Sequence, residues 1–272
     1  MPTANVNGIQ LFYELAKTDG QPLVLVHGSW ESHADWEQVV PPLSETFRVL
    51  TYDRRGHSQS ERPPGGDSIH DDVTDLAALM ETLGLAPAWI VGNSFGASIS
   101  LRLALDRSDL LRGLLVHEPP LLSLLADDPE AAPMLEDVKA QVDAVLERIA
   151  NGDHEAAAQQ FIETVAIGPG AWAEIPPENR RILIDNASTF LDESRDPDQF
   201  TFDLGRAGAI SEPVLLTTGG QSPPMFPPVI SRLAKTLPDA EVHRFPEAGH
   251  IPHVTHPDAF VGVVQDFIDR RS

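Results

Sequence analysis

The sequence contains no cysteine among its 272 residues. A disulfide framework, a thiol nucleophile and a thiolate metal site are therefore excluded. Basic residues are also scarce, because 19 Lys and Arg stand against 41 Asp and Glu, which gives a formal net charge of −22. Phosphate contacts need a basic surface, so this balance argues against nucleic acids and anionic membrane surfaces as partners.

Long apolar runs and an N-terminal signal segment are missing as well. No apolar stretch approaches the roughly 20 residues that a membrane-spanning helix needs. The opening MPTANVNGIQLFYE has no basic segment followed by an apolar one, so we expect no secretory signal peptide. We expect a cytoplasmic protein, monomeric or homodimeric, that acts on a small-molecule substrate.

What the sequence does contain is an alternation of strand and helix patterns. An Asn-Gly turn signal suggests an N-terminal hairpin, and apolar runs such as PLVLVHG, FRVLTY and AWIVGN then alternate with amphipathic stretches. Between residues 121 and 206 only helical spacing is visible, and strand patterns return at EPVLLTTGG. This order predicts an α/β fold with a mostly parallel, doubly wound sheet. Residues 1–120 and 207–272 would form its core, and 121–206 a helical cap.

One serine stands between two glycines where a strand pattern becomes a helix pattern. In GNSFG, Gly92 and Gly96 each lie two positions from Ser94. On a very tight strand-to-helix turn the serine backbone is strained, and side chains two residues away would collide. Such a turn exposes the hydroxyl beside a helix N-terminus. Ser94 is therefore a candidate nucleophile, with an ordinary glycine-rich turn as the alternative.

A histidine follows the last strand pattern, in GHIPHVTHPDAF. Imidazole titrates near neutral pH, so His250 suits the role of a base that takes and returns a proton. With His253 and His256 the segment contains three closely spaced histidines, a pattern typical of a metal site. Pro252 and Pro257 prevent a continuous helix, however, and no carboxylate stands at ligand spacing, so we expect no metal there.

The segment HGSW comes directly after an early strand pattern. A backbone N–H at this place can point at a developing oxyanion, and a second can come from the residue after the nucleophile. We expect the N–H groups of Ser29 and Phe95 to be these donors, with Trp30 close behind.

Taken in order, HGSW, YDRRGHSQS, GNSFGAS and GHIPHVTHPDAF resemble the motifs of the α/β-hydrolase fold superfamily. The resemblance covers the core, about two-thirds of the chain, and the helical insertion is variable in the family. It implies that the turn at 53–56 is mainly structural. The roles it implies are Ser94 as nucleophile, His250 as base, and Ser29 and Phe95 as oxyanion donors.

The usual triad acid is missing from its place. In most of the superfamily an aspartate follows the strand that here ends near Gly219, and Ser222 stands at that position. Glu118, in LLVHEPP, lies at the carboxyl end of another strand pattern and could reach the histidine. Haloalkane dehalogenases and zearalenone lactonases are similar in taking the acid from this position, and the latter resemble the chain in a His-Glu pair before proline. Glu118 is therefore the predicted acid, with a degenerate triad as the alternative and Asp127 and Asp128 less suitable.

A serine with a histidine base attacks acyl carbons through an acyl-enzyme. The dehalogenase and epoxide-hydrolase relatives use aspartate instead. The sequence thus predicts a hydrolase of small, largely apolar esters or lactones, without metal or cofactor. Alternatives are cofactor-free perhydrolysis, a ligand-binding module without turnover, and carbon–carbon bond hydrolysis, which would need Arg180, Arg181 or Arg206 in the pocket.

Apolar residues of the insertion and of the loop that lost its acid are expected to shape the pocket. These candidates are Trp30, Leu121, Leu122, Phe161, Trp172, Phe190, Met225 and Phe226.

Overall fold

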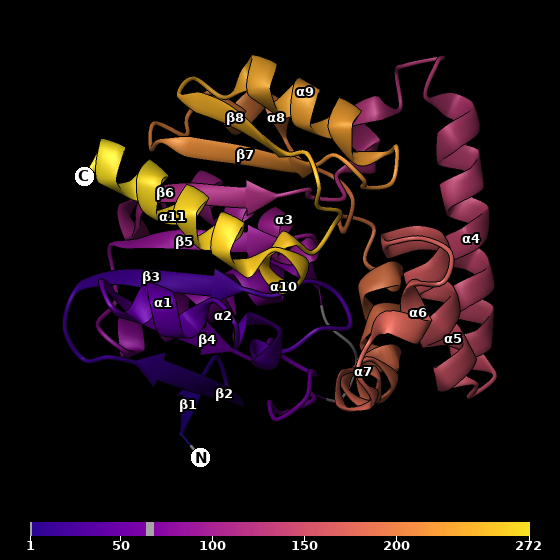
Figure 1. Cartoon of the computed structure of the whole chain (residues 1–272), viewed down its shortest axis with the longest axis horizontal. Coiled ribbons are helices and arrows are strands. Elements are labelled where there is room, and N and C mark those ends of the chain that lie inside the picture. The colour runs from indigo at the N-terminus through magenta and orange to yellow at the C-terminus, as the bar shows by residue number, and fades with distance from the viewer. Residues whose placement is uncertain (1, 64–67) are drawn as a thin grey trace.

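One eight-stranded sheet runs through the computed structural model, which describes residues 2–63 and 68–272 (Figure 1). The strand order across the sheet is β1-β2-β4-β3-β5-β6-β7-β8. The strands are β1 (Thr3–Val6), β2 (Ile9–Ala16), β3 (Gln21–Val26), β4 (Phe47–Tyr52), β5 (Ala88–Asn93), β6 (Leu111–His117), β7 (Val214–Gly219) and β8 (Ala240–Phe245).

Eleven α-helices are described. They are α1 (Val40–Ser44), α2 (Ile69–Thr82), α3 (Phe95–Asp106), α4 (Ala132–Ala150), α5 (His154–Phe161), α6 (Ala171–Glu174), α7 (Pro177–Arg195), α8 (Leu204–Ala207), α9 (Phe226–Thr236), α10 (Pro252–Thr255) and α11 (Pro257–Arg271). Shorter turns are the 3₁₀ segments His33–Trp36, Ser108–Leu110 and Leu122–Leu125 and a π-helical segment, Ile162–Ala166.

The N-terminal edge of the sheet is antiparallel and the rest is parallel. β1 and β2 form a hairpin through Asn7 and Gly8, whose φ angles of 49° and 84° are those that a two-residue hairpin turn requires. β2 then pairs antiparallel with β4, and all pairs from β4 to β8 are parallel. The expected hairpin and the expected mostly parallel sheet are confirmed.

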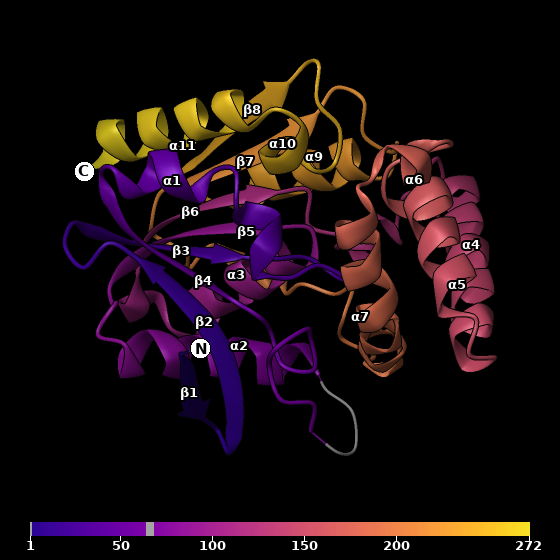
Figure 2. The ribbon, with the colours of Figure 1, turned by 60° about the horizontal axis from the view of Figure 1, so that its bottom comes forward.

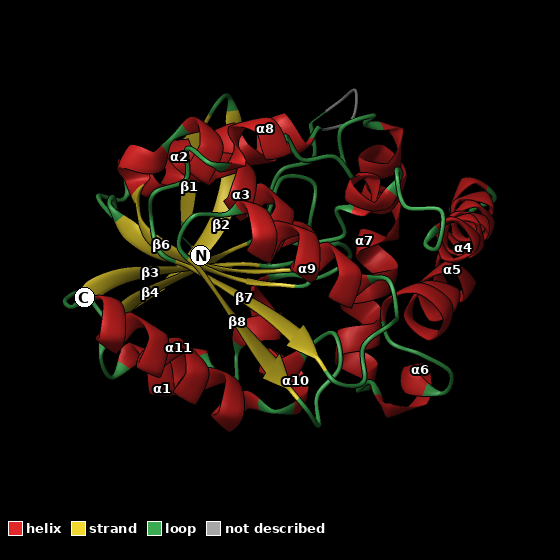
Figure 3. Ribbon diagram, turned by 90° about the horizontal axis from the view of Figure 1, so that it is seen from above, coloured by secondary structure: helices red, strands yellow, loops and turns green. Residues whose placement is uncertain are grey.

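Helices cover both faces of the sheet, as Figure 3 shows. One face carries α2, α3 and α9, and the other carries α1 and α11. β3 shows how the sequence provides for both layers, because its side chains alternate. Leu23 and Leu25 pack under α1 and α11, whereas Val24 and Val26 pack under α2 and α3.

The segment between β6 and β7 is helical and, in its described residues, contains no strand. Figure 2 shows α4, α5, α6 and α7 gathered beyond the ends of the strands. Their apolar side chains form a separate cluster that also takes in Trp30, Met225 and Phe226 from the core. The ends of the segment differ from its middle, because Leu121 and Phe202 pack into the cluster on the sheet. We call residues 121–206 the helical insertion.

Two further observations bear on the sequence predictions. Phe226, which we placed in a loop, is the first residue of α9. Pro227 and Pro228 follow at the first turn, where proline has no hydrogen bond to lose. In the described residues, no helix is both long enough and apolar enough to cross a membrane.

Candidate active site

Ser94 lies on a strained turn between β5 and α3. Its backbone has a φ of 52° and a ψ of −120°, an arrangement that costs a non-glycine residue of order 1–3 kcal/mol. The two glycines make this turn possible. A Cβ on Gly92 would lie 2.6 Å from the Gly96 carbonyl oxygen, and one on Gly96 would lie 2.2 Å from the Val26 carbonyl oxygen. The turn thus puts the serine hydroxyl at the carboxyl end of the sheet.

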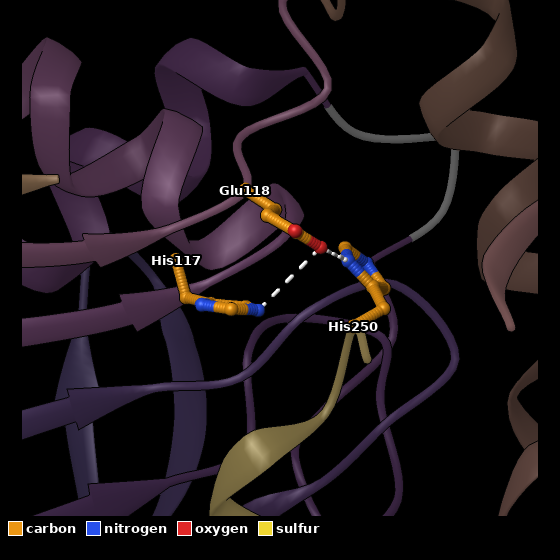
Figure 4. Close-up of side chains that lie close together, drawn as sticks. All are labelled: His117, Glu118 and His250. Atoms are coloured by element: carbon orange, nitrogen blue, oxygen red, sulfur yellow. Dashed lines mark hydrogen bonds and ion pairs between the residues drawn. The ribbon is translucent and has the colours of Figure 1, made fainter. Parts of the chain in front are cut away.

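Glu118 and His250 meet at the same edge of the sheet (Figure 4). Glu118 follows β6 directly, and His250 follows β8 after a short turn. The distance between Glu118 Oε2 and His250 Nδ1 is 2.7 Å, and both side chains are buried. A charge-assisted contact this short fixes both the orientation of the ring and the nitrogen that carries its proton.

The other oxygen of Glu118 is held by the neighbouring strand. Its Oε1 accepts hydrogen bonds from the Thr218 hydroxyl and the Gly219 N–H, each at 2.7 Å. Burial alone would raise the pKa of Glu118, but the contacts with His117 and His250 outweigh it and hold that pKa far below its usual value. The carboxylate therefore stays ionised. Its backbone is strained too, with a φ of 47°.

Ser222 occupies the position where the superfamily usually has its acid. Its hydroxyl is buried without a hydrogen-bond partner in the described residues. It lies beside Gly219, where a Cβ would come within 2.4 Å of the Ser222 Oγ. Gly219 also donates its N–H to Glu118. Ser222, which stands where the acid usually is, and the Glu118 carboxylate therefore both lie beside the same glycine.

A cavity of about 410 Å³ opens onto these groups, and both Ser94 and His250 line it. In the described residues no hydrogen bond joins the Ser94 hydroxyl to His250. Such bonds are often long in unliganded sites and tighten when substrate binds. The insertion supplies an apolar wall that includes Phe161, Ile162 and Leu183.

Acidic side chains also line the cavity. No Lys or Arg belongs to its described lining. The five carboxylates of the lining are Glu31, Asp35, Glu37, Glu174 and Glu178.

Two backbone N–H groups near Ser94 are free of protein acceptors. Neither the N–H of Ser29 nor that of Phe95 donates a hydrogen bond within the described residues. Phe95 is the first residue of α3, so its N–H has no partner within the helix. Neither N–H therefore has a competing protein acceptor, and the role of the two groups as oxyanion donors stays a prediction. Trp30, the third candidate, has a φ of 70°.

The segment 28–31, which we call the oxyanion segment, is held from the core by His27 and Arg54. His27 accepts the Arg54 N–H at Nε2 and contacts the Gly28 carbonyl through Nδ1. Burial, assisted by Arg54, lowers the pKa of His27 to about 3, so the ring is neutral. The Arg54 guanidinium donates to the Gly28 carbonyl at 3.2 Å.

Helix α7 of the insertion holds the oxyanion segment from the other side. Glu193 accepts the Ser29 hydroxyl at 2.6 Å and the Arg54 guanidinium at 2.5 Å. Asn186 donates to the carbonyls of Trp30 and Glu31 at 3.1 and 2.9 Å. Glu193 and Arg54 are both buried, and the second partner of Arg54 is Asp72 on α2.

Glu31 places a carboxyl group beside the candidate nucleophile. Its Oε2 accepts the Gly28 N–H at 2.7 Å, and a Cβ on Gly28 would lie 3.0 Å from both that oxygen and the Ser94 Cβ. Burial and the neighbouring Asp35 raise the pKa of Glu31 to about 8. Burial likewise raises the pKa of Asp35 to about 6. Near neutral pH, Glu31 therefore carries a proton.

The structure places the predicted pocket residues in three settings. Trp30 and Phe161 line the cavity, and their rings stack at 4.9 Å. Leu121 packs on the sheet, and Leu122 is half-buried between the sheet and the insertion. The other four lie in the apolar cluster of the insertion, outside the described lining: Trp172, Phe190, Met225 and Phe226.

The remaining predicted features lie away from the cavity. His253 is buried against the Trp36 ring at 4.2 Å, and His256 contacts Thr255 near the surface. Asp53 accepts hydrogen bonds from His33 and Gln59, as expected of a structural turn.

The three arginines that carbon–carbon bond hydrolysis would need have other partners: Arg180 binds the carbonyls of Ala173 and Ile175, Arg181 pairs with Asp185, and Arg206 pairs with Asp106.

Sequence reasoning missed three residues that border the site, namely His117, Glu193 and Glu31. His117 stands beside Glu118 in the sequence, and its place at a strand end was a usable signal. Phe226, which was predicted as a pocket residue, lies outside the described lining but stacks on the His250 ring at 4.3 Å. No local sequence pattern indicates a role for Glu193, because its partner Ser29 is 164 residues away. Glu31 does not stand out in the sequence either, because it is one of 41 acidic residues.

One group of side chains has metal-ligand spacing in the described residues. His117, Glu118 and His250 offer ligand atoms within 4.8 Å of one another. Two of these atoms, however, are already joined by a hydrogen bond of 2.7 Å.

A family model described as the alpha/beta hydrolase fold matches residues 21–257. The chain belongs to the α/β-hydrolase fold family. A soluble epoxide hydrolase of Corynebacterium sp. is 35% identical over 113 residues, which are 42% of this chain and 39% of that protein. The sn-1-specific diacylglycerol lipase ABHD11 of Mus musculus is 27% identical over 287 residues, covering 97% of this chain and 87% of that protein.

The solved structure of Est816, described as an N-acyl homoserine lactone degrading enzyme, is similar over 98% of this chain and 100% of its own. The TM-score is 0.73 at 22% sequence identity, so this likeness shows the hydrolase fold alone. The chain thus spans less than half of the epoxide hydrolase and most of the lipase.

Proposed function

We propose that this α/β-hydrolase cleaves carboxylic esters or lactones of small, largely apolar substrates through an acyl-enzyme. The observation that carries the proposal is the 2.7 Å contact between Glu118 and His250, a histidine that lines the same cavity as Ser94. A neutral ring whose Nδ1–H is held by a carboxylate presents its Nε2 lone pair as a base. A binding module would need no such pair.

In the proposed reaction His250 Nε2 takes the hydroxyl proton of Ser94 while the serine oxygen attacks the carbonyl carbon. The N–H groups of Ser29 and Phe95 stabilise the oxyanion. The imidazolium then returns the proton to the leaving alkoxide, and an alcohol departs, or remains tethered if the substrate was a lactone. Water attacks the acyl-enzyme with His250 again as the base, which releases the acid and restores Ser94. Glu118 stays ionised throughout and stabilises the imidazolium.

The cavity suggests the polarity of the substrate. The helical insertion, which we propose forms a cap, supplies an apolar wall, and the described lining adds carboxylates without any Lys or Arg. Anionic acyl groups are therefore disfavoured, whereas neutral apolar esters and lactones fit. The names of two similar proteins, a diacylglycerol lipase and an N-acyl homoserine lactone degrading enzyme, support the same class of bond.

The test is intact-mass spectrometry after exposure to a fluorophosphonate, comparing the wild type with Ser94→Ala. We expect one stoichiometric adduct on the wild type and none on the variant, because only an activated serine reacts. A panel of p-nitrophenyl esters and γ-lactones then separates esterase from lactonase activity. Absence of an adduct on the folded wild type, together with no turnover across the panel, would contradict the proposal and favour a ligand-binding module.

A further inference from the structure

A second histidine faces the carboxylate that holds His250. His117 is the last residue of β6, and its ring is 1% exposed. Its Nε2 lies 3.4 Å from Glu118 Oε2, the same oxygen that contacts His250 Nδ1, and Figure 4 shows the two rings on either side of the carboxylate. The proposed triad chemistry gives His117 no part.

The donors around Glu118 explain what a second ring can add. An ionised carboxylate offers about four lone-pair sites. Thr218 and Gly219 occupy both sites of Oε1, and His250 occupies one site of Oε2. His117 Nε2 has no hydrogen-bond partner within the described residues, and it faces the remaining site across 3.4 Å.

The surroundings of His117 decide which nitrogen carries its proton. Burial lowers the pKa of His117 in spite of the neighbouring Glu118, so the ring is neutral and has a single N–H. The Glu118 carboxylate and the Gly249 carbonyl are acceptors next to the ring. At Nδ1 lies the Thr217 hydroxyl, at 2.8 Å, and a hydroxyl can donate.

The opposite tautomer would be unfavourable. With the proton on Nδ1, the bare Nε2 lone pair would face a negative oxygen at 3.4 Å. The hydroxyl of Thr217 would then donate, within the described residues, to the Val116 carbonyl instead of to the ring. With the proton on Nε2, Thr217 donates to Nδ1 and every contact in the group is attractive.

We propose that His117 is a positioning residue of the active site, which donates its Nε2–H to Glu118 Oε2 and so divides that oxygen between two imidazoles. Thr217 sets the tautomer of His117, and His117 holds the Glu118 carboxylate toward His250. Because the negative charge on Oε2 is shared between two rings, Glu118 stabilises the protonated form of His250 less strongly than it would alone. The inference rests on the proposed function, in which Glu118 is the acid that orients His250.

The proposal predicts the direction of a pH effect. The titratable side chains around His117 are Glu118, His250 and His253, while Thr217 and Phe245 on the neighbouring strands are uncharged. Without the His117 donor, more negative charge on Oε2 faces His250, which then keeps its proton to a higher pH. Because His250 must be deprotonated to act, the acid limb of the kcat/KM profile moves to higher pH.

The experiment measures kcat, KM and the pH profile on a p-nitrophenyl ester. His117→Phe keeps a ring without a donor, and we expect kcat to fall about tenfold, the loss of one hydrogen bond to a charged group, with the acid limb raised by about half a unit or more. His117→Gln, whose amide can donate from nearly the same place, should lie between His117→Phe and the wild type. KM should stay unchanged, because His117 is outside the described cavity lining.

A second pair of variants tests the tautomer and replaces the first if His117→Phe does not fold. Thr217→Val removes the hydroxyl at nearly constant shape and should reproduce His117→Phe, whereas Thr217→Ser should behave as the wild type. His243→Phe, on β8 and in contact with the Phe245 ring, is the control for loss of a histidine. Thermal unfolding verifies the fold of each variant.

Three results would overturn the inference. The first is a folded His117→Phe with an unchanged kcat and pH profile. The second is a Thr217→Val that matches Thr217→Ser. The third is loss of wild-type activity with EDTA and recovery with Zn²⁺, which would make the three residues a metal site. Fluorophosphonate labelling of wild-type Ser94 reports on the proposed function separately, so a positive adduct with any of these results rejects the role of His117 alone.

Discussion

The two ends of the proposed catalytic apparatus are held by different parts of the molecule. At the acid–base end, Glu118 and His250 are fixed by the strand ends of the core, through Thr218 and Gly219. At the oxyanion end, the segment 28–31 is fixed by the core on one side and by α7 of the helical insertion on the other.

Because of this difference, we expect substitutions in the core sheet to affect the Glu118–His250 pair and substitutions in the helical insertion to affect the segment 28–31. The acid–base end depends on contacts inside the sheet, where parallel strands and buried hydrogen bonds leave little freedom. The oxyanion end depends on a buried ion pair between Arg54 and Glu193 that crosses from the core to the insertion. We therefore expect substitutions in the insertion to change the fit of the substrate and also the position of the N–H groups proposed to stabilise the oxyanion.

The largest effect should come from breaking the acid–base end. Glu118→Gln keeps the shape of the side chain but removes the charge that orients His250 and stabilises its cation. We expect kcat on a p-nitrophenyl ester to fall by roughly 10³–10⁴ with the fold intact. Near-normal turnover would contradict the assignment of the acid.

A double variant sharpens this result. Ser222→Asp in the Glu118→Gln background puts a carboxylate at the position next to Gly219, and a partial recovery of kcat would show that either strand end can serve the same histidine. Ser222→Asn in the same Glu118→Gln background is the control without charge.

An intermediate effect should come from breaking the oxyanion end. Glu193→Ala removes the acceptor of Ser29 and one partner of a buried guanidinium, and removal of one member of a buried pair costs about 3–5 kcal/mol. Asp72 still pairs with Arg54, so we expect the lower part of that range, measured as the free energy of unfolding in urea. kcat should fall about tenfold as Ser29 loses its fixed position.

Asp192→Asn is the matched control on the same helix. Asp192 pairs with Arg62, which is 40% exposed, and exposed pairs are worth at most about 1 kcal/mol. Equal losses in the two variants would mean that the oxyanion segment does not depend on the buried pair.

The smallest effect should be a pH dependence at the oxyanion end. Glu31 loses its proton as the pH rises through about 8, which puts a negative charge beside the site of the developing oxyanion. We expect wild-type kcat/KM to decline severalfold between pH 7 and pH 9 relative to that of Glu31→Gln, which has no such charge. The ratio of the two activities across this range is the measurement, and a constant ratio would contradict the expectation.

The same pKa shift has a consequence for stability. The folded protein binds a proton on Glu31 up to about pH 8, whereas the unfolded chain releases it near the ordinary glutamate pKa of 4.5. The contribution of Glu31 to stability therefore decreases as the pH rises between these values. The Tm of Glu31→Gln should accordingly rise relative to that of the wild type over this range.

The sequence predicted the fold, because the patterns that indicate strands and helices lie within short stretches of the chain. Alternating patterns identified the strands, and the mostly parallel sheet with helices on both faces is confirmed. The start of α9 at Phe226 was missed because the four prolines at positions 223, 224, 227 and 228 are typical of a loop, although two of them stand in the first helical turn. The catalytic assignment to Ser94, Glu118 and His250 stays a prediction, now with a geometry that can be tested.

The sequence by itself determined the tight turn at Ser94, because only glycines fit at positions 92 and 96, and it marked Glu118 as a carboxylate at a strand end that could reach His250. Only the tertiary structure decided which distant groups meet. Glu118 reaches His250 across 132 residues and Ser29 reaches Glu193 across 164, and no local pattern encodes either contact. The physical reason is that backbone conformation follows from neighbouring residues, whereas a side-chain contact depends on where whole strands and helices pack.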